Sequence, residues 1–112
     1  MSATGAEIDR ILAETEEADD ALRAVVAALA EAPDVAWAGI AFLEEGALTL
    51  GPSAGVADPA RRTTVTVTFN GDPVGELRVD GEADPALLAH VAAAVSTHVL
   101  VGWDTGGASW DP

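Results

Sequence analysis

Residues 63–80 decide the fold: Thr63-Thr-Val-Thr-Val-Thr-Phe69, then Asn70-Gly-Asp72, then Pro73-Val-Gly-Glu-Leu-Arg-Val-Asp80. In the first run, apolar residues alternate with threonines, which is the pattern of a strand with one buried face. Asn70 and Gly71 accept the positive φ of a tight turn. In the last run, Gly75, Leu77 and Val79 alternate with charged residues. The stretch therefore predicts an antiparallel hairpin.

Two registers are open to this hairpin. A two-residue turn at Asn70 and Gly71 would pair Val65 with Glu76 and mix the two faces. A three-residue loop keeps like faces together and gives these pairs: Val65 with Leu77, Thr64 with Arg78, and Arg62 with Asp80. Because a one-residue slip moves every side chain to the other face, the pattern selects the second register.

The segment before this hairpin predicts another one. Residues 35–43 are apolar on both faces, which is typical of a strand covered on both sides. Residues 44–46 form a three-residue loop, and residues 47–51 return. The predicted pairs are Leu43 with Ala47, Phe42 with Leu48, and Ile40 with Leu50. One face then carries Ile40, Phe42, Leu48 and Leu50, and the other carries Trp37, Gly39, Ala41, Thr49 and Gly51.

A helical pattern precedes the hairpins. Over residues 6–31, apolar side chains recur every three or four positions, beginning with Ile8, Ile11 and Leu12. The region is one long helix or two helices with a joint near Asp19 and Asp20. Pro33 cannot continue the hydrogen-bond ladder, so it ends the helical region.

A second helical pattern follows the hairpins. Asp84 can cap the first turn, and Pro85 suits the first helical position. The apolar stripe of this helix includes Leu87, Val91 and Val95. Gly102 is the predicted end, and residues 103–112 are predicted to be a flexible C-terminal tail.

Several of these segments resemble a known family. Val35-Ala-Trp-Ala-Gly-Ile-Ala-Phe-Leu43, followed by Leu48-Thr-Leu-Gly-Pro52 and Gly55, is similar to the first hairpin of GAF domains. The nearest branch contains the free methionine-(R)-sulfoxide reductases. Residues 74–80 resemble the last strand of that family, and residues 84–101 resemble its closing helix.

The resemblance implies an α+β fold with one GAF-like, profilin-like domain over residues 1–102. The expected sheet has four antiparallel strands in the order 2-1-4-3, with the N- and C-terminal helices packed on one face. The central segment of the family, which normally helps to close a pocket, is here reduced to about residues 55–61. We therefore expect an open groove in place of a buried pocket.

The residues do not favour catalysis. The related reductases use cysteine chemistry, and this chain has no cysteine, so that activity is excluded. The family also places an acid two residues before Asp80, where this chain has Arg78. His90 and His98 lie eight residues apart on one helix, which is not the spacing of a metal pair. We expect no catalytic residues, no metal and no cofactor.

Charge and composition limit the partners. The chain of 112 residues has 19 acidic and five basic residues, all five arginine, and a net charge of −14. Such a surface repels phosphate and anionic lipid, so we expect neither nucleic acid nor a membrane as partner. No apolar stretch is long enough for a bilayer and no leader pattern is present, so we expect the cytoplasm. The absence of lysine beside abundant Ala, Val, Gly and Asp indicates a bacterial source.

One predicted sheet face is a candidate ligand site. Its members share a polar or aromatic side chain on that face: Trp37, Thr49, Thr64, Thr66, Glu76, Arg78 and Asp80. Arg78 would anchor an anion and Trp37 would form an apolar wall. The alternative is a solvated face with cross-strand pairs, in which Arg62 and Asp80 form a surface ion pair.

Two functions remain open. The first is a non-catalytic binding or regulatory module that forms a homodimer through its terminal helices and binds a small ligand on the opposite sheet face. The candidate interface residues lie on the two helical stripes: Ile8, Ile11, Leu12, Leu87, Val91 and Val95. The second is a purely structural protein–protein interaction module, as in roadblock domains, without a ligand.

Overall fold

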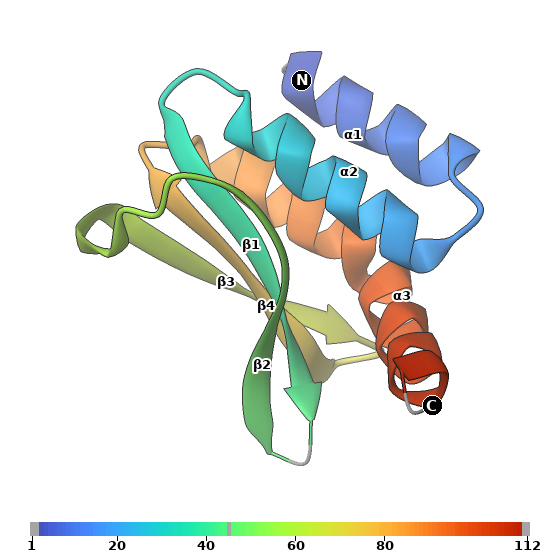
Figure 1. Cartoon of the computed structure of the whole chain (residues 1–112). Helices are drawn as coiled ribbons and strands as arrows, with labels where there is room; N and C mark the ends of the chain where they lie inside the picture. Colours follow the sequence, from blue (N-terminus) through green and yellow to red (C-terminus); the bar gives the residue numbers. More distant parts are fainter. Residues whose placement is uncertain (1–2, 45, 111–112) are drawn as a thin grey trace.

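Four antiparallel strands form one sheet in the order β2-β1-β4-β3 (Figure 1). They are β1 Val35–Glu44, β2 Ala47–Gly55, β3 Arg62–Phe69 and β4 Asp72–Gly81. The computed structural model describes the backbone of residues 3–44 and 46–110 and the side chains of residues 4–43 and 46–99. The predicted order of the sheet is confirmed, with the two hairpins joined through β1 and β4.

Three helices cover one face of this sheet (Figure 1). They are α1 Ala3–Glu14, α2 Ala18–Ala30 and α3 Pro85–Trp110. α2 contacts β1 and β2, α3 contacts β3 and β4, and α1 packs on both α2 and α3. The N-terminal region is thus two helices, with a joint at residues 15–17 that lies just before the predicted one. Within the described ranges, no helix is long and apolar enough to cross a bilayer.

The apolar stripes of the helices pack against the core of the same chain. Ile8, Val91 and Val95 are each 0% exposed, while Ile11, Leu12 and Leu87 are partly buried against the same core. The dimer interface predicted on Ile8, Val91 and Val95 is therefore wrong. The reason is the joint at residues 15–17, which lets α1 fold back and cover the surface that one long helix would leave for a partner.

The hairpin of β3 and β4 has the predicted pairs, but a different loop. Val65 lies opposite Leu77, Thr64 opposite Arg78, and Arg62 opposite Asp80. The turn has only two residues, Asn70 and Gly71, at φ 55° and 86°. A bulge next to Val67 absorbs the extra residue on β4. The tight turn and the matched faces are therefore compatible.

The hairpin of β1 and β2 differs from the prediction by one residue. The observed pairs are Glu44 with Ala47, Leu43 with Leu48, Phe42 with Thr49, and Ala41 with Leu50. Opposite residues in an antiparallel pair share a face. Leu48 and Leu50 therefore lie on the face that bears Ala41, away from the helices, and Thr49 lies on the helix side. The predicted faces were wrong because both strands are apolar throughout, so no alternation fixed the register.

The predicted end of the last helix at Gly102 is wrong, because α3 continues to Trp110. The flexibility of residues 103–112 stays a prediction, since their side chains lie outside the described ones.

We expect Val91→Asp to unfold the domain, because it places an unpaired carboxylate in a fully buried position. The free energy of unfolding should fall by about 4 kcal/mol, measured by urea denaturation followed by circular dichroism. Ala93→Asp is the matched control, because Ala93 is exposed on the same helix. A folded, stable Val91→Asp protein would contradict this packing.

Candidate functional site

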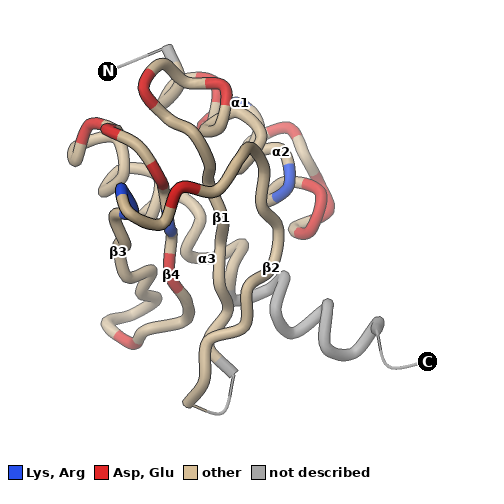
Figure 2. Tube along the Cα trace, turned by 60° about the vertical axis from the view of Figure 1, so that its left-hand side comes forward, with Lys and Arg blue, Asp and Glu red and all other residues tan. Residues whose placement is uncertain are grey.

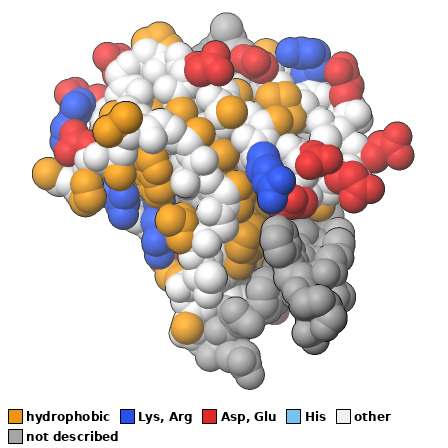
Figure 3. Space-filling view, viewed as in Figure 1, with side chains coloured by type: hydrophobic (Ala, Val, Ile, Leu, Met, Phe, Trp, Pro, Cys, Tyr) orange, Lys and Arg blue, Asp and Glu red, His pale blue; other side chains and the backbone are white. Residues whose placement is uncertain are grey.

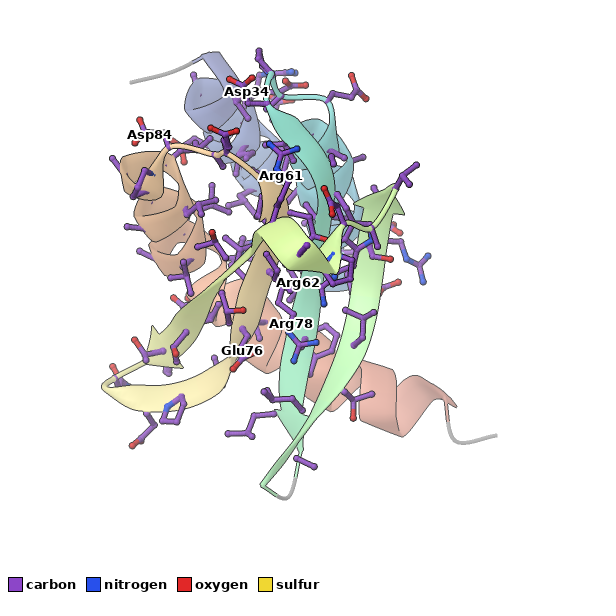
Figure 4. All side chains as sticks on the ribbon, turned by 90° about the vertical axis from the view of Figure 1, so that its left-hand side faces the viewer. Asp34, Arg61, Arg62, Glu76, Arg78 and Asp84 are labelled. Carbon is purple, nitrogen blue, oxygen red and sulfur yellow. The ribbon has the colours of Figure 1, made fainter. Side chains whose placement is uncertain are left out.

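The sheet has a face with no helix over it, which we call the open sheet face. The strand pairing arranges its residues in three rows: Trp37, Asp80 and Arg62; Gly39, Arg78 and Thr64; and Leu50, Ala41, Glu76 and Thr66. Leu43 and Leu48 continue it at the β1–β2 hairpin. Figure 4 looks onto this face, with the link of residues 56–61 passing in front of the strands. The link includes the 3₁₀ turn Pro59–Arg61.

Asp80 is the best-connected residue of the open sheet face. Its side chain is fully buried and accepts two hydrogen bonds from Arg62, with Nε 2.7 Å from Oδ1 and Nη2 3.0 Å from Oδ2. The backbone N–H of Asp58 donates to Oδ2 at 2.6 Å. The predicted pairing of Arg62 with Asp80 is therefore present, but the prediction that the pair lies on the surface is wrong. The link covers Asp80, so the pair is half-buried and also holds the link in place.

These contacts set the charge of Asp80. The hydrogen bond from Arg62 lowers the pKa of the Asp80 carboxyl below its ordinary value of 3.8, and the N–H of Asp58 lowers it further. Burial acts in the opposite direction but is the smaller effect. Asp80 therefore stays ionised and pairs with Arg62 at neutral pH.

Trp37 lies under this pair and is only 6% exposed. The guanidinium carbon of Arg62 is 4.6 Å from the centroid of the Trp37 ring, which is a cation–π distance. The ring also extends over Gly39, where an added Cβ would lie 2.7 Å from Trp37 Cζ2 and 3.2 Å from Leu50 Cδ1. Trp37 is thus covered on this face, and Gly39 is required beneath it.

Arg78 and Glu76 occupy the middle of the face. Arg78 Nε donates to Glu76 Oε1 at 3.1 Å, and the two side chains are 23% and 25% exposed. Gly39 and Thr64 flank Arg78 across the sheet, and these small neighbours leave the pair accessible from above. Arg78 is therefore part of a balanced ion pair with Glu76, and its predicted role as an anion anchor stays a prediction.

A shallow cavity of about 250 Å³ adjoins this pair. Apolar, small and polar residues of all four strands and a turn line it: Leu43, Gly46, Leu48, Thr66, Pro73, Gly75 and Glu76. Sequence reasoning missed Leu43, Leu48 and Pro73. Leu48 was assigned to the other face by the one-residue register error. Glu76 belongs both to the cavity wall and to the ion pair, so charge and apolar surface meet there.

The structure brings together six of the seven predicted ligand residues: Trp37, Thr64, Thr66, Glu76, Arg78 and Asp80. Thr49 is the exception, because it pairs with Phe42 and lies on the helix side. His90 is away from this site, and its Nε2 lies 2.9 Å from Asp9 Oδ1 between α3 and α1. Within the described residues, no group of His, Cys, Asp and Glu could hold a metal ion.

We expect Asp80→Asn to lower the Tm by several degrees at neutral pH, because Arg62 and the Asp58 N–H lose a charged acceptor. The folded pKa of Asp80 lies below its unfolded value, so its contribution is present above about pH 4 and is lost as the pH falls through the folded pKa. The Tm difference between wild type and variant should therefore shrink on acidification.

Asp19→Asn is the matched control for this measurement. Asp19 pairs with Arg23 on the helix surface, where both side chains are about half exposed, and such pairs contribute little. Equal Tm losses in the two variants, or a gap that grows with acidification, would contradict the role of Asp80.

Comparisons with known proteins agree with this geometry. No family model matches the sequence, and no curated protein matches it. The GAF domain from Acinetobacter phosphoenolpyruvate-protein phosphotransferase is similar in structure, with a TM-score of 0.72 at 15% identity over 93% of this chain and 97% of that chain. The free methionine-R-sulfoxide reductase of Staphylococcus aureus, in complex with substrate, gives a TM-score of 0.63 at 16% identity over 85% and 95%. Its reduced form gives 0.67 at 13% identity over 86% and 92%. The resemblance seen in the sequence is thus confirmed as a likeness of fold, and this chain has a GAF-like α+β fold.

Proposed function

We propose that this chain is a non-catalytic, GAF-like binding module that takes a small zwitterionic ligand with an apolar tail on the open sheet face. The absence of cysteine removes the nucleophile that the related reductases use. GAF-fold domains often bind ligands or mediate regulation. One of the structural neighbours, the Staphylococcus aureus reductase, was solved with its substrate.

One observation carries the proposal: the accessible Arg78–Glu76 pair beside an apolar cavity. A pair of opposite charges, each about one quarter exposed, matches a ligand with both a carboxylate and an ammonium group. The cavity beside Glu76 has apolar walls at Leu43, Leu48 and Pro73. An apolar tail of a few carbons fits its volume of about 250 Å³.

The alternative is a protein–protein interaction module without a small ligand. The exposed side chains of Leu48, Leu50 and Val56 favour it, because large apolar side chains on a surface are typical of contact sites. The two functions differ in what the Arg78–Glu76 pair does. Only the ligand hypothesis requires both charges to be present for a small molecule to bind.

The test is a binding screen with free amino acids that have aliphatic or aromatic side chains. Backbone amide shifts in NMR would locate any binding, and the matching amines and carboxylic acids test each charge separately. We expect an amino acid to bind with a dissociation constant of about 1 mM or tighter, while the amine and the acid alone do not. The shifts should cluster on β4 around Glu76 and Arg78.

Variants make this screen decisive. Arg78→Ala and Glu76→Gln should each weaken binding about tenfold or more. Arg23→Ala is the matched control, because Arg23 also pairs with a carboxylate but lies on α2. Absence of binding across the panel, or equal binding by Arg78→Ala and wild type, would favour the interaction module.

A further inference from the structure

We propose that two copies of this chain associate through β2, which pairs antiparallel with β2 of the second copy about a two-fold axis at Thr49. The partner is thus this chain itself, and the product is one continuous eight-stranded sheet. This inference does not rest on the ligand proposed above, although Leu48 belongs to both contacts.

β2 presents an unprotected edge. β2 lies at the end of the sheet, so one side of its backbone pairs with no strand among the residues that the structure describes. Edge strands usually carry charges that prevent pairing with other chains. Here no charged residue occurs from Gly46 to Ala57. The same stretch holds the large exposed apolar side chains of the described residues: Leu48 at 40%, Leu50 at 49% and Val56 at 80%.

The charge distribution also favours contact at the β2 edge. With a net charge of −14, two copies repel one another wherever their acidic surfaces meet. Figure 2 shows acidic residues on the helices, on the loops at the ends of the sheet and on β4, while β2 is free of charge along its length. Figure 3 shows hydrophobic side chains down the middle of the face that β2 crosses, with acidic side chains toward its margins. The β2 edge is therefore a place where like-charged copies can approach.

β2 is complementary to itself in an antiparallel pair. The segment available for pairing lies between the turn at Gly46 and Pro52, which has no N–H to donate; its last residue, Gly51, lies at the irregularity between β1 and β2. Its central residue is Thr49. Antiparallel pairing about Thr49 places Leu48 of one copy opposite Leu50 of the second copy, and the reverse. Both leucines lie on the open sheet face, so each exposed leucine covers the other.

The size of this contact predicts its strength. Five paired residues bury less area than a standard protein interface, so we expect a dissociation constant on the order of 10 µM. Because the copies have like charge, added salt should strengthen the association by screening their repulsion. A contact between oppositely charged surfaces would respond to salt in the other direction.

The first experiment measures mass by sedimentation equilibrium across a concentration series at low and moderate salt. We expect a monomer–dimer equilibrium that shifts toward the dimer with salt. Leu50→Glu should weaken dimerisation about tenfold or more, because it places a charge against Leu48 of the second copy. Val56→Glu is the matched control, since Val56 is more exposed but lies beyond the pairing segment. A monomer at all concentrations, or a dimer unaffected by Leu50→Glu, would overturn the proposal.

The second experiment tests the register directly. The chain has no cysteine, so Thr49→Cys introduces its only thiol. Residues opposite each other in an antiparallel pair have Cβ atoms about 5 Å apart, close enough for a disulfide after small adjustment. Thr49→Cys should therefore form a covalent dimer at least tenfold faster than Val56→Cys under the same oxidising conditions. Equal rates in the two variants would rule out a two-fold axis at Thr49.

A rescue variant separates a lost contact from a damaged fold. In Leu48→Lys/Leu50→Glu, the introduced lysine at position 48 faces the introduced glutamate at position 50 of the second copy. Dimerisation should return to within about threefold of wild type. Failure of the double variant to exceed Leu50→Glu alone, with both proteins folded by circular dichroism, would contradict the proposed register.

Discussion

The link between β2 and β3 constrains the rest of the molecule, because it must carry the chain from one edge of the sheet to the other. That crossing spans three strand spacings, about 14 Å, and six residues reach about 21 Å when fully extended. No length remains for a helix over the sheet. The face opposite the helices is therefore left open, and the link itself needs an anchor. Asp80 supplies it, since one carboxylate binds both the N–H of Asp58 within the link and the guanidinium of Arg62 at its end. The cover that this gives is local, over Trp37, and the middle of the face stays accessible.

The distribution of charge follows the same division. Between Glu7 and Glu31, α1, α2 and the residues next to them carry eight acidic residues, which keep this layer hydrated and away from other acidic surfaces. On the open sheet face, by contrast, the charges occur in matched pairs: Arg62 with Asp80 and Arg78 with Glu76. A chain with a strongly negative total charge thus has one face that is close to neutral. Both proposed contacts, with a zwitterion and with a second copy, use this face or its edge, where the long-range field of the protein opposes them least.

Sequence patterns predicted those parts of the fold in which one face differs from the other. The alternation in β3 and β4 gave the right pairs, although the structure combines a two-residue turn with a bulge that no pattern revealed. In β1 and β2 the residues are apolar on both faces, so the pattern does not determine the length of the loop between them. The predicted register is therefore off by one residue, and it places Thr49 on the wrong face of the sheet. The prediction of the candidate site has a similar limit. Asp80 alternates with core residues, so the strand pattern predicts that it lies on the surface. The pattern contains no information about the link that folds over Asp80. The pattern of the last helix likewise predicts Val91 and Val95 on an exposed apolar stripe, because it contains no information about the position of the α1–α2 joint.

The contact between His90 and Asp9 joins residues that are 81 positions apart. A ribosome adds about 5–20 residues per second, so roughly 4–16 s pass between the synthesis of one partner and the other. During that interval α2 is the only other helix available to α1, and the two form a helical pair with one side still uncovered. The hairpin of β3 and β4, closed by a local turn, has its full sequence before any of α3 is made. Docking of α3 against the helical pair and the hairpin is then the step that completes the core. The order of translation therefore favours a nascent chain in which α1 and α2 form before α3 packs against them.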